Sequence, residues 1–283
     1  MEKYSVLMSV YQKDDANALK ESVDSILNQT VKTDNFVIVK DGPLTDELNQ
    51  ILDNYAKKYP EICIITLKKN VGLGKALHTG LLYCKNELVA RMDADDISLA
   101  TRIEKELEYL KKHPEIDIVG SQSLEFIDDI TKPVQYNQYP LTHLEIEKYA
   151  HMRNPYSHPS VIFKKSKVLL SGNYQDAYLC EDYDLWIRMI QSGCICANLD
   201  EYLLAVRISK DFYKRRSGLK YVKSIHYLMR KNMKIGFFTK GEYIKNMIIR
   251  SIVYLMPNTL RSLFYSKILR KGNQNNESIT YSA

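Results

Sequence analysis

The sequence of 283 residues predicts an α/β fold in which a mostly parallel sheet carries helices on both faces. Short apolar runs alternate with helical patterns of about ten or more residues, which is typical of parallel strands joined by crossover helices. Hydrophobic residues make up 45% of the chain and charged residues 26%, so the composition is that of an ordinary globular protein. The length exceeds that of one average domain, and we therefore expect one large core with an appendage.

The hydrophobic pattern places the elements of the first part of the chain in order. We expect a buried strand at 5–11, followed by a helix that has Leu19 and Val23 on one face. A helix near 45–58 should end at Tyr59, since a residue that precedes a proline is biased away from helical backbone. The remaining predicted elements are strands at 36–42, 62–67 and 87–93 and helices at 75–84 and near 99–112.

The predicted strand at 87–93 ends in three acids, Asp93, Asp95 and Asp96. Open α/β sheets bind ligands at the carboxyl ends of their strands, so these acids are expected at a binding site. Carboxylates this close together repel one another unless they are protonated or share a cation. Mg²⁺ or Mn²⁺ suits them, because these ions take oxygen ligands from one or two carboxylates and from substrate phosphates. The other strand ends predicted at the same rim are 11–15, Asp41 and 70–72.

Two other interpretations of the acidic segment stay open. Asp95, Asp96 or Ser98 could instead cap the helix that follows. An EF-hand loop counted from Asp93 fits less well, because its sixth position is Ser98 rather than glycine.

Five segments resemble glycosyltransferase family 2, the inverting GT-A nucleotide-sugar transferases, in their order and separation. The resemblance covers about residues 4–207, and its segments read SVLMSVY, FVIVKDG, NVGLGKAL, ARMDADD and CEDYDLWIRM. It implies a GT-A fold, which is Rossmann-like, in a catalytic domain at 1–210. It also implies that a UDP-sugar is the donor.

The resemblance implies contacts to the nucleoside from two strand ends. The segment that begins with Tyr11 would contact the nucleoside, and Asp41 would accept a hydrogen bond from the uracil ring. Lys75 would approach the base or the diphosphate. Lys40 stands where the family usually has an acid, which weakens the case for a ribose contact from this turn.

The acidic segment matches the DxD motif of the family. By this resemblance, Asp93 would bind the ribose or the water shell of the metal, and Asp95 would ligate the metal directly. Asp96 would touch the sugar. His158, in the segment SHPSVIF, would contact the diphosphate or the metal, although a histidine beside a proline often serves only as a hydrogen-bonding residue of a loop.

Inverting transfer is a single displacement at the anomeric carbon, so a carboxylate must accept the proton of the acceptor hydroxyl. Asp182 matches the catalytic acid position of the family and is the expected base, with Glu181 as the alternative. These acids could instead serve the dipole at the start of a helix, an interpretation that fits Asp184 best. Trp186 is expected to anchor the core rather than to stack on a sugar.

The end of the chain is strongly basic. Residues 201–283 hold 17 Lys and Arg against 4 Asp and Glu, whereas residues 1–200 hold 23 against 30. Arg207 and Arg215 are candidates to neutralise the departing diphosphate. The region 211–283 is predicted to form basic amphipathic helices that dock on an anionic membrane surface, or a helical hairpin that covers the catalytic domain. No recognised nucleic-acid-binding motif accompanies this charge.

The resemblance to bacterial members of the family implies a metal-dependent transferase that moves a hexose, either galactose or glucose, from a UDP-sugar to an undecaprenyl-diphosphate-linked saccharide. The expected setting is the biosynthesis of bacterial O-antigen, capsule or exopolysaccharide. The N-terminus lacks the charged and apolar regions of a signal peptide, so we expect a cytoplasmic protein at the inner face of the cell membrane. The alternatives are a non-catalytic binder of nucleotide sugars or polysaccharide, and a sugar nucleotidyltransferase.

Overall fold

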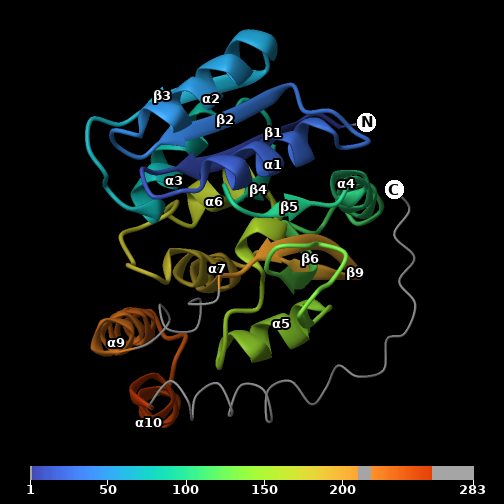
Figure 1. Ribbon diagram of the computed structural model, residues 1–283. Helices are drawn as coiled ribbons and strands as arrows, with labels where there is room; N and C mark the ends of the chain where they lie inside the picture. The colour runs from blue at the N-terminus through green and yellow to red at the C-terminus, as the bar shows by residue number, and fades with distance from the viewer. Residues whose placement is uncertain (1, 210–217, 257–283) are drawn as a thin grey trace.

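A computed structural model describes residues 2–209 and 218–256, and within them one sheet of nine strands runs through the molecule (Figure 1). The first half of this sheet alternates strands with helices, as the sequence predicts. Its elements are β1 (Tyr4–Val10), α1 (Ala16–Leu27), β2 (Asn35–Lys40), α2 (Asp46–Lys58), β3 (Ile62–Thr66), α3 (Leu73–Tyr83), β4 (Leu88–Met92) and α4 (Arg102–Lys112). The four strands pair in parallel in the order β3-β2-β1-β4. Every predicted element of this half is confirmed, with ends that differ by a few residues.

The second half of the sheet contains both parallel and antiparallel pairs, so the predicted, mostly parallel arrangement describes only the first half. Its elements are β5 (Ile97–Ser98), β6 (Ile118–Phe126), β7 (Gln135–Asn137), α5 (His143–Ala150), the 3₁₀ turn η1 (His158–Ser160), β8 (Ile162–Lys164), α6 (Lys165–Leu170), α7 (Glu181–Gln191) and β9 (Cys196–Arg207). β8 runs antiparallel to both β4 and β6, whereas β6 and β9 are parallel.

Side chains of the strands alternate between two cores, because successive residues of a strand point to opposite faces of the sheet. Leu7 and Val89 lie in the core that α3 and α7 cover. Val6 and Ala90, their neighbours along β1 and β4, lie in the core that α1 and α4 cover. Helix α3 packs so close to the sheet that a Cβ on Gly80 would lie 2.5 Å from Val39 Cγ2, so only glycine fits there.

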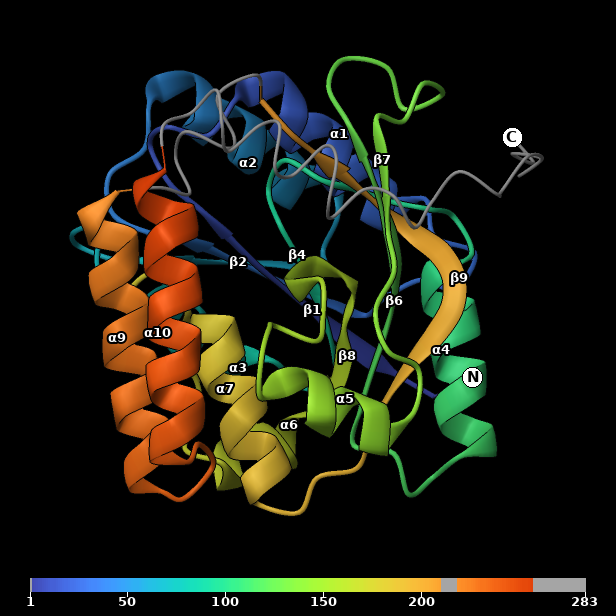
Figure 2. The same ribbon diagram turned by 90° about the horizontal axis from the view of Figure 1, so that it is seen from below.

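Two helices follow the sheet, α9 (Leu219–Lys234) and α10 (Lys240–Leu255), and they lie side by side (Figure 2). Leu228 and Met229 of α9 are buried in the same core as the residues of α7. A helical hairpin over the catalytic core, one of the two predicted arrangements, is therefore present. No helix in the described part of the chain is long and apolar enough to cross a bilayer.

Candidate active site

The carboxyl ends of β1, β2 and β4 lie at one edge of the sheet. Val10 at the end of β1 pairs with Lys40 at the end of β2, and β4 runs parallel on the other side of β1. The residues that follow these three strands are Tyr11, Asp41 and Asp93. The predicted rim of strand ends is therefore present, and it contains the acidic segment.

Asp41 fixes the turn that leads into α3. Its buried carboxylate accepts hydrogen bonds from the backbone N–H groups of Val71, at 2.7 Å, and Gly72, at 3.0 Å. The Asn70 side chain donates to the Asp41 carbonyl oxygen. Asp41 therefore joins two of the predicted strand ends, and its contact to a uracil ring stays a prediction. Lys40 points away from them and donates to Asn49 on α2, at 3.0 Å.

The three acids after β4 lie in different environments. Asp95 is exposed, the Asp93 side chain is 32% exposed, and Asp96 is buried. Oδ1 of Asp96 accepts a hydrogen bond of 2.8 Å from the backbone N–H of Arg207. Burial, with the charge of Asp95 next in effect, raises the pKa of Asp96 well above its usual value. Asp95 and Asp93 are thus the more accessible acids, and the predicted contact of Asp96 with the sugar stays untested.

Arg207, the last residue of β9, contacts the acidic segment. Its Nε donates to the backbone oxygen of Asp95 at 3.0 Å, and its guanidinium also forms an ion pair with Glu21. The guanidinium lies over the Phe126 ring. The structure therefore places Arg207 against the turn that contains Asp95 and Asp96, and a contact to the departing diphosphate stays a prediction. Arg215 lies outside the described residues.

Arg91 contacts a predicted site residue and was not predicted from the sequence. Its side chain is completely buried, and Nη2 lies 2.5 Å from Oδ1 of Asp93. The signal was present in the sequence, since a charged residue inside an otherwise apolar buried strand needs an explanation.

The predicted base and its neighbour open helix α7. Oδ2 of Asp182 accepts a hydrogen bond of 2.6 Å from the Asn154 side chain, and Oδ1 accepts one of 2.7 Å from the N–H of Tyr183. Burial, and then the charge of Asp182, raises the pKa of Glu181 to about 7. Asp93 also raises this pKa, so the charges of the two acidic motifs act on one another.

Asp184, also in the first turn of α7, has a structural role. It is fully buried and pairs with Arg188 at 2.9 Å and with Lys231 of α9 at 2.8 Å. Asn232 donates to its other oxygen at 3.2 Å. Asp184 therefore joins the helix that carries the predicted base to the C-terminal hairpin.

His158 and Trp186 lie beneath the site rather than in its opening. His158 is 8% exposed, and its Nε2 lies 2.9 Å from the hydroxyl of Tyr174. Burial, with a smaller effect of the Arg91 charge, lowers the pKa of His158 well below its usual value, so the ring is neutral. The ring of Trp186 packs edge-on against that of His158 and is 1% exposed. The expectation that Trp186 anchors the core is confirmed, whereas a contact of His158 with a ligand stays a prediction.

Comparison with known proteins identifies the family. The family model described as "Glycosyl transferase family 2" matches residues 5–169. The chain belongs to this family. It is 38% identical over 272 residues to the amylovoran biosynthesis glycosyltransferase AmsE of Erwinia amylovora, covering 95% of this chain and all of that one. It is 37% identical over 273 residues to the UDP-Gal:alpha-D-GlcNAc-diphosphoundecaprenol beta-1,3-galactosyltransferase of Escherichia coli, covering 95% and 97%.

Solved structures of low identity share the fold of this family 2 transferase. S. aureus TarS, residues 1–349, superposes with a TM-score of 0.65 at 15% identity, over 95% of this chain and 76% of that one. The mannosyltransferase PcManGT from Pyrobaculum calidifontis, in complex with GDP-Man and Mn²⁺, superposes with a TM-score of 0.64 at 15% identity, over 88% and 69%. The expected GT-A fold is confirmed.

Lys75 lies at the first turn of α3, on the side of the site opposite β4. Its ammonium group forms an ion pair of 2.7 Å with Asp176, and both side chains are more than half exposed. Asp176 belongs to the loop 171–180 that leads into α7, and a Cβ on Gly74 would lie 2.7 Å from the Gln175 carbonyl oxygen of this loop. The predicted contact of Lys75 with the base or diphosphate would require it to leave this partner.

Two carboxylates of the transferase are suitable ligands for a divalent cation that also binds a diphosphate. Within the described residues, no three His, Cys, Asp or Glu side chains converge as a ready metal site. Two accessible carboxylates, Asp93 and Asp95, are what Mg²⁺ or Mn²⁺ needs from a protein when a diphosphate and water supply the other ligands. The residues present therefore fit the predicted ion, and its identity stays open.

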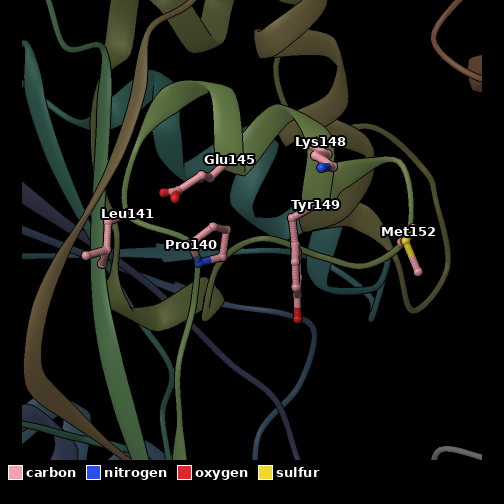
Figure 3. A pocket seen from close by; sticks show the side chains of 6 residues that line it. All are labelled: Pro140, Leu141, Glu145, Lys148, Tyr149 and Met152. Atoms are coloured by element: carbon pink, nitrogen blue, oxygen red, sulfur yellow. The ribbon is translucent and has the colours of Figure 1, made fainter.

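A surface hollow lies apart from the predicted donor residues (Figure 3). It has a volume of about 430 Å³ and is formed around α5, and none of the predicted site residues lines it. Its lining residues are Pro140, Leu141, Glu145, Lys148, Tyr149 and Met152.

Proposed function

We propose that this chain is a metal-dependent, inverting hexosyltransferase that moves galactose or glucose from a UDP-sugar to a saccharide on undecaprenyl diphosphate. The observation that carries the proposal is the common electrostatic environment of the two acidic motifs. Burial and the charge of Asp182 are the main causes of the raised pKa of Glu181; Asp93 of the proposed DxD segment adds to the rise, and Arg91, which is paired with Asp93, opposes it. This interaction between the proposed metal-binding acid and the neighbour of the proposed base supports a displacement at an anomeric carbon.

The similarity to the Escherichia coli relative supports the substrate classes. That protein is a UDP-Gal:alpha-D-GlcNAc-diphosphoundecaprenol beta-1,3-galactosyltransferase, and this chain aligns with 97% of it. UDP-galactose carries its sugar in an α linkage, so a β product means inversion at the anomeric carbon. The amylovoran relative supports a role in surface polysaccharide biosynthesis.

In the proposed reaction, Asp182 accepts the proton of the acceptor hydroxyl while the hydroxyl oxygen bonds to the anomeric carbon. The bond from that carbon to the UDP oxygen breaks, and its electrons stay on the diphosphate. Asn154 fixes the orientation of the Asp182 carboxylate through their 2.6 Å hydrogen bond. Asp95 and Asp93 would hold Mn²⁺ or Mg²⁺, which supplies positive charge to the departing diphosphate when it is bound.

The outer faces of the hairpin support a peripheral position on the inner face of the cell membrane. On α10, apolar side chains that are at least 49% exposed share one helical face, and they are Ile244, Ile248, Ile249, Ile252 and Leu255. On α9, the exposed side chains are mainly basic, and they include Lys220, Lys223, Arg230 and Lys234. Adjacent apolar and basic stripes favour the interface of an anionic bilayer, where a lipid-linked acceptor is found.

The test is UDP release from a panel of UDP-sugars with Mn²⁺, with and without a polyprenyl-diphosphate-linked GlcNAc acceptor. We expect one donor to give acceptor-stimulated release that Asp182→Asn abolishes. Asp128→Asn, an exposed acid after β6, is the matched control and should keep wild-type rates. Metal-dependent UDP binding without release from any donor across a range of acceptors would instead support a non-catalytic binding protein. Pyrophosphate formation from a nucleoside triphosphate and a sugar phosphate would support a nucleotidyltransferase.

A further inference from the structure

Arg91 is a charged residue in a place where proteins rarely keep one. It lies in the middle of β4 between Ala90 and Met92, and its relative exposure is 0%. The side chain is directed to the same face of the sheet as Val89, toward the core under α3 and α7. Burying a guanidinium is costly unless it is paired and hydrogen-bonded, so a stable fold alone would favour an apolar residue here.

Hydrogen bonds do not offset the free-energy cost of burying Arg91. None of its three side-chain nitrogens meets hydrogen-bond geometry with a group in the described chain, although Arg91 has five N–H donors. Its ion pair within the described residues is the 2.5 Å contact between Nη2 and Oδ1 of Asp93. A buried cation whose single close partner is the first acid of the DxD motif points to a role in that motif.

The charge of Arg91 also reaches acids on two other segments. Burial is the main reason why the pKa values of Asp14 and Glu181 are raised, and in both cases the charge of Arg91 opposes the rise. Asp14 follows β1, and Glu181 opens α7. Arg91 is therefore a buried positive charge that acts on acids of both segments.

We propose that Arg91 is the positioning residue of the donor site: it holds the Asp93 carboxylate in one orientation and keeps the surrounding acids from repelling it. The inference rests on the proposed function, because the orientation matters only if Asp93 takes part in binding a metal and a diphosphate. Arg91 itself is too buried to touch the donor. It acts through its ion pair with Asp93, in the way that outer partners orient metal ligands.

The test is calorimetry of UDP binding, with Mn²⁺ and with EDTA, for wild type, Arg91→Gln and Arg91→Lys. Removal of an outer partner of a metal ligand typically costs about 10–100-fold in metal affinity, and we expect a loss in that range for Arg91→Gln. Arg91→Lys keeps the charge without the fork of donors and should recover part of this loss. Binding in EDTA should be equal in all three proteins.

Arg102 offers a matched control. It is equally buried, pairs with Glu106 at 3.3 Å rather than with the site acids, and donates a hydrogen bond of 2.9 Å to the backbone oxygen of Arg91, so it tests whether disturbing a buried arginine beside β4 is enough to weaken binding. Arg102→Lys should leave Mn²⁺-dependent UDP binding unchanged. A second check is the double variant Arg91→Gln with Asp93→Asn, which should lose no more affinity than Asp93→Asn alone, since coupled residues are not additive.

The outcomes separate the inference from the proposed function. Wild-type protein without Mn²⁺-dependent UDP binding would overturn both. Wild-type binding that persists unchanged in folded Arg91→Gln, or an equal loss in Arg102→Lys, would overturn the role of Arg91 alone. If Arg91→Gln does not fold, Arg91→Lys decides the question, because its charge is kept: unchanged metal dependence would reject the inference.

Discussion

The side-chain amide of Asn154 donates a hydrogen bond of 2.6 Å to Oδ2 of Asp182. Asn154 lies in the segment after α5, whereas Asp182 is in the first turn of α7, so the bond joins two separate segments of the second half of the fold. The other oxygen, Oδ1, accepts from the N–H of Tyr183. Together these bonds hold the carboxylate in one orientation, which a base needs in order to meet the acceptor hydroxyl.

Replacing Asn154 with alanine should therefore slow transfer without weakening donor binding. The loss of one hydrogen bond to a charged group is worth about 1.5–3 kcal/mol, so kcat should fall about 10-fold or more. Steady-state kinetics would give this result, with KM for the UDP-sugar within about twofold of wild type. Asn54→Ala, at an exposed position of α2, is the control. An unchanged kcat would remove the positioning role of Asn154.

The two acidic motifs should separate binding from chemistry. Asp95→Ala should abolish Mn²⁺-dependent UDP binding, because the exposed carboxylate is the predicted direct ligand of the metal. Asp182→Asn should retain that binding and lose transfer by a factor of at least about 10², the usual contribution of a general base. Calorimetry and UDP release measure the two quantities. An equal loss of binding in both variants would contradict this division of roles.

Glu181 should make the protein less stable as the pH rises. Burial, and then the charge of Asp182, raises its pKa from the ordinary value of 4.5 to about 7 in the folded state. The folded protein therefore binds this proton more tightly than the unfolded chain does, and stability that is full below pH 4.5 is lost as the pH rises toward 7. Glu181→Gln should thus raise the free energy of unfolding by about 3 kcal/mol at pH 8 and change it little at pH 4.5.

Urea unfolding at these two pH values measures the effect, and Glu108→Gln, at an exposed position of α4, should show no such dependence on pH. A variant that is equally destabilised at both pH values would show that Glu181 is ionised and satisfied in the fold.

Asp184 should be more important for stability than for chemistry. Its carboxylate is 0% exposed and is shared by Arg188 and Lys231, so Asp184→Asn leaves two cations without their anion. Breaking a buried pair in this way costs about 3–5 kcal/mol. The free energy of unfolding in urea should fall by this amount, whereas Asp128→Asn should have no effect. A loss below about 0.5 kcal/mol, the range of surface changes, would show that the hairpin does not depend on this contact.

The apolar stripe of α10 should determine membrane binding. Ile248→Glu and Ile252→Glu place a charge on side chains that are 57% and 58% exposed, so the fold should tolerate them. We expect both variants to sediment less with anionic phospholipid vesicles while they keep wild-type UDP binding. Leu170→Glu, at a position of α6 that is 73% exposed, is the control. Unchanged sedimentation of the α10 variants would exclude this face as the docking surface.

The sequence predicted the first half of the fold because its strands and helices repeat clear periods. The long strand β6 was missed because its middle reads Ser121, Gln122 and Ser123, which are buried although they are polar. Gln122 explains how this is tolerated, since its side chain donates to the Tyr139 carbonyl and accepts from the Tyr139 N–H. Such partners come from distant segments, and no local pattern reveals them.

The residues of the candidate site that belong to sequence motifs were predictable. The burial and the contacts of the other residues depend on tertiary packing and were not. Asp93, Asp95 and Asp182 were predicted from their motifs, and the structure places them after β4 and at the start of α7. Burial of His158 and the use of Arg207 as a clamp depend on the packing of η1 and β9 against β4 and β5. The hydrogen bond from Asn154 to Asp182 likewise depends on how the segment after α5 lies against α7.

The contact between Asp184 and Lys231 also has a mechanical consequence. It joins α7, which begins with the proposed base, to α9, and α9 packs along α10. A continuous series of packed helices therefore connects the outer face of α10 to Asp182. If α10 rests on a bilayer, the base is held at one height above the lipid headgroups. Acceptors would then be sorted by how far their reactive hydroxyl stands above the membrane, so the length of the growing saccharide becomes a criterion separate from the identity of its sugars.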